Sequence, residues 1–168
     1  LYEEARQSSE ERAALIEIGR ALSTPEALSD LQTVYQTIYE QVRRVMPTDA
    51  FFVTRYYQAT DRLFMEYLID EGVVYPPIEY RPIRPQTRQF LFEERVGLMF
   101  SSAQEYLNFT KNSLNTDEDI IGSDHPSESL LFVPIRYGEE IIGMLSAQSY
   151  LSHAYTRRHL EMLKEIGV

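Results

Sequence analysis

The chain has 168 residues, of which 43% are hydrophobic and 25% are charged, a balance that fits one folded domain and excludes a disordered chain. Its formal net charge is −10, from 26 acidic and 16 basic residues, which argues against a nucleic-acid partner because phosphate binding depends on clustered Lys and Arg. Cysteine is absent, which excludes disulfides, thiolate metal sites and a cysteine nucleophile and is consistent with a cytoplasmic location.

Neither end of the chain has the features of a membrane or export signal. No stretch approaches the roughly 20 apolar residues of a membrane-spanning helix, and the first residues are charged rather than signal-like. The chain begins on Leu and stops inside an apparent helix, so we expect a fragment of a larger protein that makes no membrane contact itself.

The first part of the chain predicts two helices. Residues 1–22 form a polar lead-in helix with apolar positions on one face, and Thr24 followed by Pro25 suits the start of a second helix. This second helix carries a continuous apolar stripe at spacings of three and four, formed by Leu28, Leu31, Tyr35, Ile38, Val42 and Val45. The stripe is too short for a coiled coil, and it predicts a helix that lies on a sheet.

From residue 50 onward the apolar period becomes that of strands. Residues 50–57 and 63–69 predict a hairpin, and residues 73–83 predict an edge strand because Pro76, Pro77 and Pro82 cannot donate to a sheet ladder. Short helices are expected over residues 86–95 and 103–109, with a brief strand at 96–101 between them and a polar loop up to Glu128.

The last forty residues give the clearest pattern. Residues 129–136 and 140–149 are apolar strands on either side of a tight turn at Gly138, and Thr156 is positioned to cap a closing helix. Together these elements predict an α+β fold. It has a central, largely antiparallel sheet of five or six strands, terminal helices on one face, and a roof of helix and loop over a pocket on the other.

The final hairpin also resembles a known family. Residues 129–149 are similar to the terminal hairpin of GAF domains, which runs from Ser through apolar residues to Val-Pro-Ile, a polar turn, Ile-Gly and a Ser-containing end. In this chain the pattern is carried by Ser129, Val133-Pro134-Ile135, Ile142-Gly143 and Ser146, and by Ala154-Tyr155-Thr156 before the closing helix. Gly143 is expected to leave room for the close approach of a helix or ligand, and Pro134 to lie where the strand is not paired on one side.

The resemblance implies a domain organisation and a function. We expect residues 1–22 to be a lead-in helix and residues 23–168 to be the domain. It implies a regulatory module that senses a small molecule and forms a homodimer through its terminal helices, passing a signal to an output domain in the same parent chain. The parent that the resemblance favours is a bacterial sensor histidine kinase. No catalytic activity is expected of this fragment.

The resemblance places a ligand pocket beneath a roof formed by residues 84–128. Aromatic residues concentrate on the strands and helices expected there, and aromatic cavities with a few polar groups are typical of small-molecule sites. The pocket residues expected on this basis are Phe52, Tyr67, Tyr80, Phe90, Phe100, Tyr106, His125 and Phe132.

Several activities found in the family are excluded or disfavoured by the residues present. Covalent bilin attachment and free methionine sulfoxide reduction both need Cys, which is absent. The Asn-Lys-x-Phe-Asp-Glu signature of cyclic-nucleotide-binding members is also missing. His125 lies among acidic residues, but dispersed acids on a polar loop are normally solvated, so no metal site is expected. No catalytic motif is found, and the cofactor, if there is one, stays unidentified.

Two interpretations of the pocket stay open. An open cavity with convergent polar groups would favour a small-molecule sensor. A cavity filled by the protein's own aromatic side chains would favour a degenerate GAF domain, which acts only in dimerisation and signal relay. An enzyme of unknown type ranks below both.

Overall fold

The computed structural model describes residues 2–22, 30–82, 85–110 and 125–167, and the chain divides into two compact units, Leu1–Thr48 and Asp49–Val168. The first unit holds α1 (Tyr2–Leu22) and α3 (Leu31–Val45), which contact each other. The described residues contain no helix that is long and apolar enough to cross a membrane.

Helix α3 begins at Leu31 and carries the described part of the predicted apolar stripe. The side chain of Asp30 caps it by accepting a hydrogen bond from the Thr33 N–H at 3.2 Å. Ile38 and Val42 of the stripe are buried. The predicted start at residues 24–25 and the first stripe position, residue 28, lie outside the described residues.

The second unit is built on one antiparallel sheet. Its strands are β1 (Ala50–Tyr57), β2 (Arg62–Asp70), β3 (Val73–Tyr75), β4 (Ile78–Pro82), β5 (Leu98–Phe100), β6 (Ser129–Tyr137) and β7 (Glu140–Ser149). The order along the sheet is β3-β2-β1-β7-β6-β5, and β4 also pairs with β2. The α+β class with an antiparallel sheet is therefore confirmed.

The main path of the sheet has six strands, as predicted, and β4 adds a seventh beside it because the predicted edge strand is interrupted. Pro76 and Pro77 lie between β3 and β4, and neither residue has a backbone N–H for a ladder. Both short strands pair with β2, so the division of the edge strand leaves the order of the central strands unchanged.

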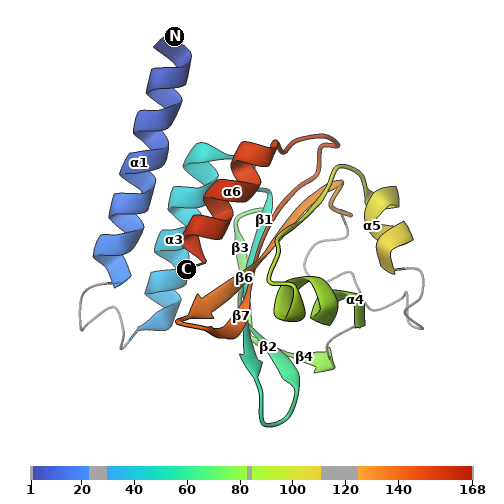
Figure 1. The fold of residues 1–168 in the computed structure, drawn as a ribbon. Helices are drawn as coiled ribbons and strands as arrows, with labels where there is room; N and C mark the ends of the chain where they lie inside the picture. The colour runs from blue at the N-terminus through green and yellow to red at the C-terminus, as the bar shows by residue number, and fades with distance from the viewer. Residues whose placement is uncertain (1, 23–29, 83–84, 111–124, 168) are drawn as a thin grey trace. The chain divides into compact units, whose positions relative to one another are not determined.

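Helices cover the two faces of this sheet. Helix α6 (Arg157–Ile166) lies on one face and contacts β6, whereas α4 (Pro85–Thr87), η1 (Arg88–Glu93) and α5 (Ala103–Thr110) lie on the other side (Figure 1). Alternation along the strands sends Phe51 and Leu131 toward the α6 face and their neighbours Phe52 and Phe132 toward the opposite face.

The two family residues of the last hairpin have structural roles. A Cβ atom at Gly143 would lie 2.1 Å from the Thr54 carbonyl oxygen, so the close approach is that of strand β1 and not of the helix or ligand expected from the sequence. Pro134 lies beyond the last residue of β6 that pairs with β5, Phe132, so its missing N–H removes no ladder bond there. Gly138 turns the hairpin with a φ of 61°.

The closing helix is capped as the sequence predicts. The Thr156 hydroxyl accepts from the His159 N–H at 3.4 Å, and the Thr156 N–H donates to His159 Nδ1 at 3.0 Å. His159 therefore takes part in the cap through both its backbone and its side chain. At the far end of α6 the Arg136 N–H donates to the Gly167 carbonyl at 2.7 Å, which ties the helix to β6.

The buried phenol of Tyr155 predicts a loss of stability at alkaline pH. Burial, and then the negative charge of Asp49, raise the pKa of Tyr155. The folded state thus holds a proton that the unfolded chain releases near pH 10, so this contribution is fully present below about pH 10 and is lost as the pH rises further. We expect the unfolding free energy of the wild type to fall up to about 1.4 kcal/mol per pH unit more steeply than that of Tyr155→Phe above pH 10.

Urea unfolding at pH 8, 10, 10.5 and 11 measures this difference. The other tyrosines are common to both proteins, so their titration cancels when the two slopes are subtracted. Equal slopes for wild type and Tyr155→Phe above pH 10 would contradict the prediction.

Candidate functional site

A cluster of aromatic and aliphatic side chains covers the sheet face opposite α6. Its buried members come from β2, η1, β5, β6 and β7, and they are Leu63, Leu91, Phe100, Leu130, Phe132 and Met144. Half-buried side chains that pack against them are Phe52, Tyr56, Phe92, Leu98, Tyr106 and Phe109. We call these twelve residues, together with Phe90, the aromatic cluster.

The rings of this cluster contact one another across five elements. Phe132 on β6 lies 6.1 Å from Phe52 on β1, 6.1 Å from Phe100 on β5 and 5.9 Å from Tyr106 on α5, as measured between ring centroids. Phe109 links Phe100 at 5.1 Å to Phe90 on η1 at 5.5 Å. Most of these pairs are tilted or edge-on, the geometry that aromatic rings prefer in packed interiors.

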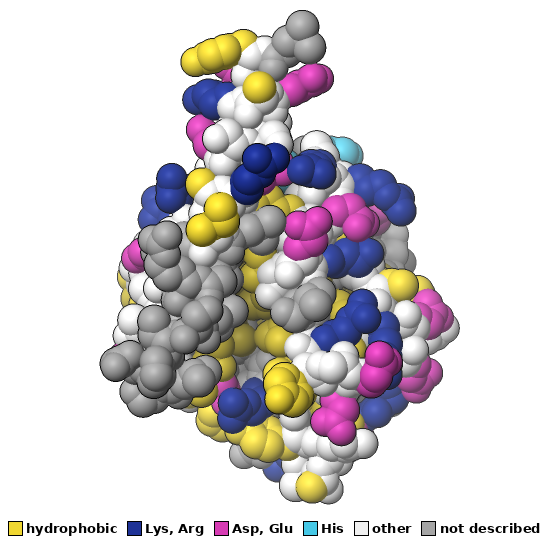
Figure 2. Space-filling view, turned by 60° about the vertical axis from the view of Figure 1, so that its left-hand side comes forward, with side chains coloured by type: hydrophobic (Ala, Val, Ile, Leu, Met, Phe, Trp, Pro, Cys, Tyr) yellow, Lys and Arg dark blue, Asp and Glu magenta, His cyan; other side chains and the backbone are white. Residues whose placement is uncertain are grey.

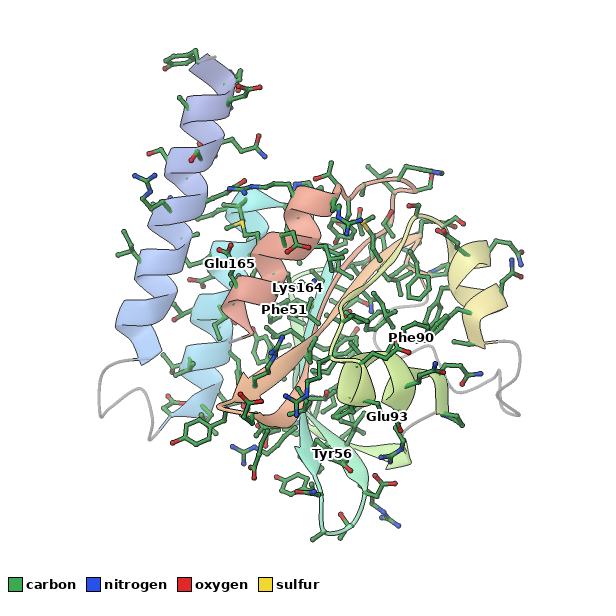
Figure 3. The ribbon with its side chains drawn as sticks, in the orientation of Figure 1. Phe51, Tyr56, Phe90, Glu93, Lys164 and Glu165 are labelled. Atoms are coloured by element: carbon green, nitrogen blue, oxygen red, sulfur yellow. The ribbon has the colours of Figure 1, made fainter. Side chains whose placement is uncertain are left out.

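Five of the eight pocket residues expected from the sequence lie in this cluster. They are Phe52, Phe90, Phe100, Tyr106 and Phe132. In Figure 3 Phe90 lies beside η1, away from α6, whereas Phe51 lies next to α6. Each of the five side chains comes from a different element, so the sheet pairing and the roof helices bring them together.

Tyr67 lies on the other face of the sheet. Strand β2 has a bulge, because Val53 pairs with Tyr67 while the next residue of β1, Thr54, pairs with Met65. The extra residue reverses the alternation, so Leu63 and Met65 share the cluster face but Tyr67 does not. Its ring lies edge-on to Phe51 at 6.3 Å, and it is not brought together with the aromatic cluster.

The two remaining expected residues are not placed in the cluster either. His125 is exposed, and its Nδ1 lies 2.9 Å from Glu71 Oε1, with its ring 5.2 Å from that of Tyr150. Tyr80 belongs to β4, but its side chain lies outside the described residues. Within the described part of the chain, no group of three His, Asp or Glu residues is arranged to hold a metal ion.

The sheet beneath the cluster carries polar residues that were not among the pocket residues expected from the sequence. Ser146 on β7 pairs with Phe52 on one side and Phe132 on the other, so it lies in the middle of the cluster face. It is fully buried, and its hydroxyl accepts a hydrogen bond from Gln148 Nε2 at 3.0 Å. The period-two spacing of Met144, Ser146 and Gln148 is the signal that could have identified this face.

One end of the cluster is closed by a charged network. The Tyr56 hydroxyl donates to Asp61 Oδ1 at 2.7 Å, and the Arg88 guanidinium of η1 donates to the same oxygen. The hydrogen bonds from Arg88 and then from Tyr56 lower the pKa of Asp61. The Tyr56 ring also meets Phe92 of η1 edge-on at 4.8 Å, so this network joins the β1–β2 hairpin to the roof.

The roof element η1 has an uncommon backbone. It is a six-residue π-helix in which the Glu94 N–H donates to the Gln89 carbonyl at 2.8 Å. Arg95, which follows it, has a φ of 59°, a region that costs energy for a residue with a Cβ. Short π-helices of this kind are frequent at functional sites.

Charge does not gather into one patch on the face seen in Figure 2. Basic and acidic side chains are interspersed there, which is the pattern of an ordinary solvated surface.

Comparisons with known proteins agree on the fold. The family model described as the GAF domain matches residues 30–168. The GAF domain of an Acinetobacter phosphoenolpyruvate-protein phosphotransferase is 12% identical, with 97% of this chain and 89% of that chain covered and a TM-score of 0.62. No curated protein matches the sequence.

Other similar structures belong to different functional classes. A phycocyanobilin-bound GAF domain from a cyanobacterial phytochrome is 16% identical over 95% of this chain and 88% of that chain, with a TM-score of 0.61. A free methionine-R-sulfoxide reductase from Neisseria meningitidis, in complex with its substrate, is 15% identical over 96% and 81%, with a TM-score of 0.54. At these identities the likeness concerns the fold alone.

Proposed function

Because this chain belongs to the GAF domain family, a regulatory fold used for ligand sensing in signalling proteins, we propose that it is the small-molecule-sensing domain of a multidomain signalling protein. The aromatic cluster is the sensing site in this proposal. The observation that carries it is the convergence of rings from β1, β5, β6, η1 and α5 on one sheet face, above the buried polar side chain of Ser146. Apolar walls with a few polar groups are typical of small-molecule sites.

A second candidate is supported by the same rings. Phe100 and Phe132 contact their aromatic neighbours at 5.1–6.1 Å, so the protein's own side chains pack together where a ligand would lie. A domain that keeps this packing at all times would act only in dimerisation and signal relay. The two candidates differ in whether a small molecule can enter the cluster.

The remaining parts of the proposal concern partners. We assign residues 1–22 as a lead-in helix and residues 23–168 as the domain, and we expect a homodimer through the terminal helices. The output domain would lie in the same parent chain, with a cytoplasmic bacterial sensor histidine kinase of a two-component system as the favoured parent. This fragment itself is proposed to be regulatory rather than catalytic.

A thermal-shift screen combined with sedimentation tests this proposal. A ligand present at about 100 times its dissociation constant stabilises a folded domain by about 2.7 kcal/mol, which raises the melting temperature of a chain of this size by roughly 5 °C or more. The screen should include purines, bilins, haem and metal ions alongside neutral aromatic compounds. A sensor should also change its dimer dissociation constant about fivefold or more when the ligand binds.

The outcomes separate the candidates. A ligand that stabilises the domain and shifts the dimer equilibrium supports the sensor. A dimer that forms equally with every compound, none of which raises the melting temperature, supports the relay. A chain that stays monomeric at high micromolar concentration with or without ligand contradicts the proposed dimer.

A further inference from the structure

The hydrogen-bonding capacity of Ser146 and Gln148 is only partly used. Ser146 is 0% exposed, and the one hydrogen bond found for its side chain among the described residues is the bond from Gln148. Ser146 has a donor and an acceptor, and Gln148 has an oxygen and two N–H groups. Whichever way the amide is turned, the pair therefore keeps at least one donor and one acceptor unused.

Donors and acceptors that the protein itself leaves unused are available to a ligand or a bound water. This pair lies beneath the rings, since Ser146 is flanked on its neighbouring strands by Phe52 and Phe132. Gln148 is half-buried and pairs with Leu130 of the same cluster. A molecule resting on these rings would present its edge to a donor and an acceptor side by side.

Tyr106 occupies the place that such a molecule would take. Its ring is stacked on that of Phe132, with an interplanar angle of 24° and a centroid distance of 5.9 Å, whereas Phe100 meets Phe132 edge-on at 73°. Tyr106 comes from α5, a helix of eight residues whose Phe109 also reaches into the cluster. The ring can therefore leave Phe132 if α5 shifts.

The centre of the face beneath the rings carries no charge, because the Asp61–Arg88 network and the register positions of Asp70 and Arg136 lie toward its ends. The side chains that the three central strands place around Ser146 there are Phe52, Thr54, Leu130, Phe132, Met144 and Gln148. An ionised ligand buried against these residues would lack a counter-charge, which is strongly unfavourable. The chemistry of this face thus selects a neutral molecule.

We infer that the site takes a neutral, planar heteroaromatic molecule with an adjacent hydrogen-bond donor and acceptor, which displaces the Tyr106 ring from Phe132 and bonds to Ser146 and Gln148. This inference rests on the proposed sensing function and specifies its ligand class. Displacement of Tyr106 moves α5, which couples occupancy of the site to the roof.

Two small probes test whether the ligand's adjacent donor and acceptor bond to Ser146 and Gln148. Quinolin-2(1H)-one has adjacent N–H and C=O groups on a flat bicyclic ring, and its N-methyl derivative keeps the ring but replaces the N–H donor with a methyl group. Titration of protein labelled with 13C at the methionine methyl groups reports where each probe binds. Met144 lies in the cluster, and Met162 on α6 is equally buried outside it, so Met162 is the internal control.

The expected result is a saturable shift of the Met144 signal with little change at Met162. Quinolin-2(1H)-one should bind about fivefold more tightly than its N-methyl derivative, the factor expected for one neutral hydrogen bond. Ser146→Ala and Gln148→Leu should each reduce this preference to less than about twofold.

Variants of α5 test the displacement. Tyr106→Ala removes the competing ring and should tighten binding of quinolin-2(1H)-one at least about threefold. The reason is that the contact between Tyr106 and Phe132 no longer has to be broken before the probe binds. Leu107→Ala alters an exposed neighbour on the same helix and should leave binding unchanged.

Three results would overturn the inference. Equal affinity for the two probes in the wild type would show that the site does not recognise the adjacent donor and acceptor. Unchanged affinity in a folded Tyr106→Ala variant would show that binding does not displace the Tyr106 ring. Absence of any saturable Met144 shift, in both wild type and Tyr106→Ala, would show that the site does not bind neutral heteroaromatic molecules of this class. If another compound still raises the melting temperature and shifts the dimer equilibrium, the sensing function survives these failures, and if none does, that function fails as well.

Discussion

Replacement of Gly143 by Ala should destabilise the domain by about 3 kcal/mol or more, one of the two largest effects expected of a single substitution in this chain. The added Cβ would lie 2.1 Å from the Thr54 carbonyl oxygen and 3.2 Å from the Thr54 carbonyl carbon. Both contacts are with the backbone of β1, which pairs with β7 in the middle of the sheet. Because no flexible side chain can move aside, the two central strands would have to separate.

A matched control is available in the same hairpin. Gly138 has a φ of 61°, but a Cβ added there meets nothing within 4 Å. Gly138→Ala should therefore cost only the conformational strain of an L-residue, about 1 kcal/mol. Chemical unfolding in guanidinium measures both variants. Similar losses for Gly143→Ala and Gly138→Ala would show that β1 and β7 do not approach as closely as described.

Removal of the Phe132 ring should cost about 3–5 kcal/mol, the range for deletion of a buried aromatic side chain. Phe132 is 8% exposed and contacts the rings of Phe52, Phe100 and Tyr106. Phe132→Ala leaves a cavity among these rings, and rings held by strands of the sheet can collapse into it only in part. Phe132→Leu retains much of the volume and should lose less.

Tyr137→Ala is the control for this prediction. Tyr137 ends the same strand, but its side chain is 78% exposed, so its loss should change the unfolding free energy by no more than about 0.5 kcal/mol. The comparison is made by equilibrium unfolding followed by circular dichroism. A Phe132→Ala protein within about 1 kcal/mol of the wild type would contradict the packing of the cluster.

These two substitutions probe different requirements of the same sheet. Gly143 sets the spacing between β1 and β7, and Phe132 sets the packing above them. The stability of the closed cluster also bears on the proposed function, because a ligand that separates Tyr106 from Phe132 must compensate for the contacts it breaks. A cluster that is too stable to open is what the relay candidate requires.

Local sequence signals predicted the elements well where a short segment carries its own information. The turn at Gly138, the cap at Thr156 and the two apolar strands of the last hairpin were all predicted correctly. Each depends on residues only a few positions apart, which is the range over which propensity and periodicity act. The edge position of residues 73–83 was also confirmed, although the two prolines divide it into β3 and β4.

The candidate site was predicted only in part because it depends on contacts between distant segments. Aromatic content identified five members of the cluster, but strict alternation along β2 would have placed Tyr67 with Leu63. The bulge opposite Val53 and Thr54 reverses that alternation, and no local signal in the sequence marks it. The partners of Ser146 were similarly hidden, because Phe52 lies on a strand more than ninety residues away in the chain.

The sequence by itself determined the positions of most strands and helices, the absence of cysteine chemistry and the resemblance of the last hairpin to GAF domains, because each of these follows from residue identity and short-range spacing. Only the tertiary structure decided which face each aromatic ring occupies, that β1 rather than a ligand approaches Gly143, and that Tyr106 stacks on Phe132 above a polar pair with unused hydrogen-bonding groups. The physical reason is that strand register and bulges are fixed by pairing across the sheet, and a shift of one residue moves a side chain to the opposite face.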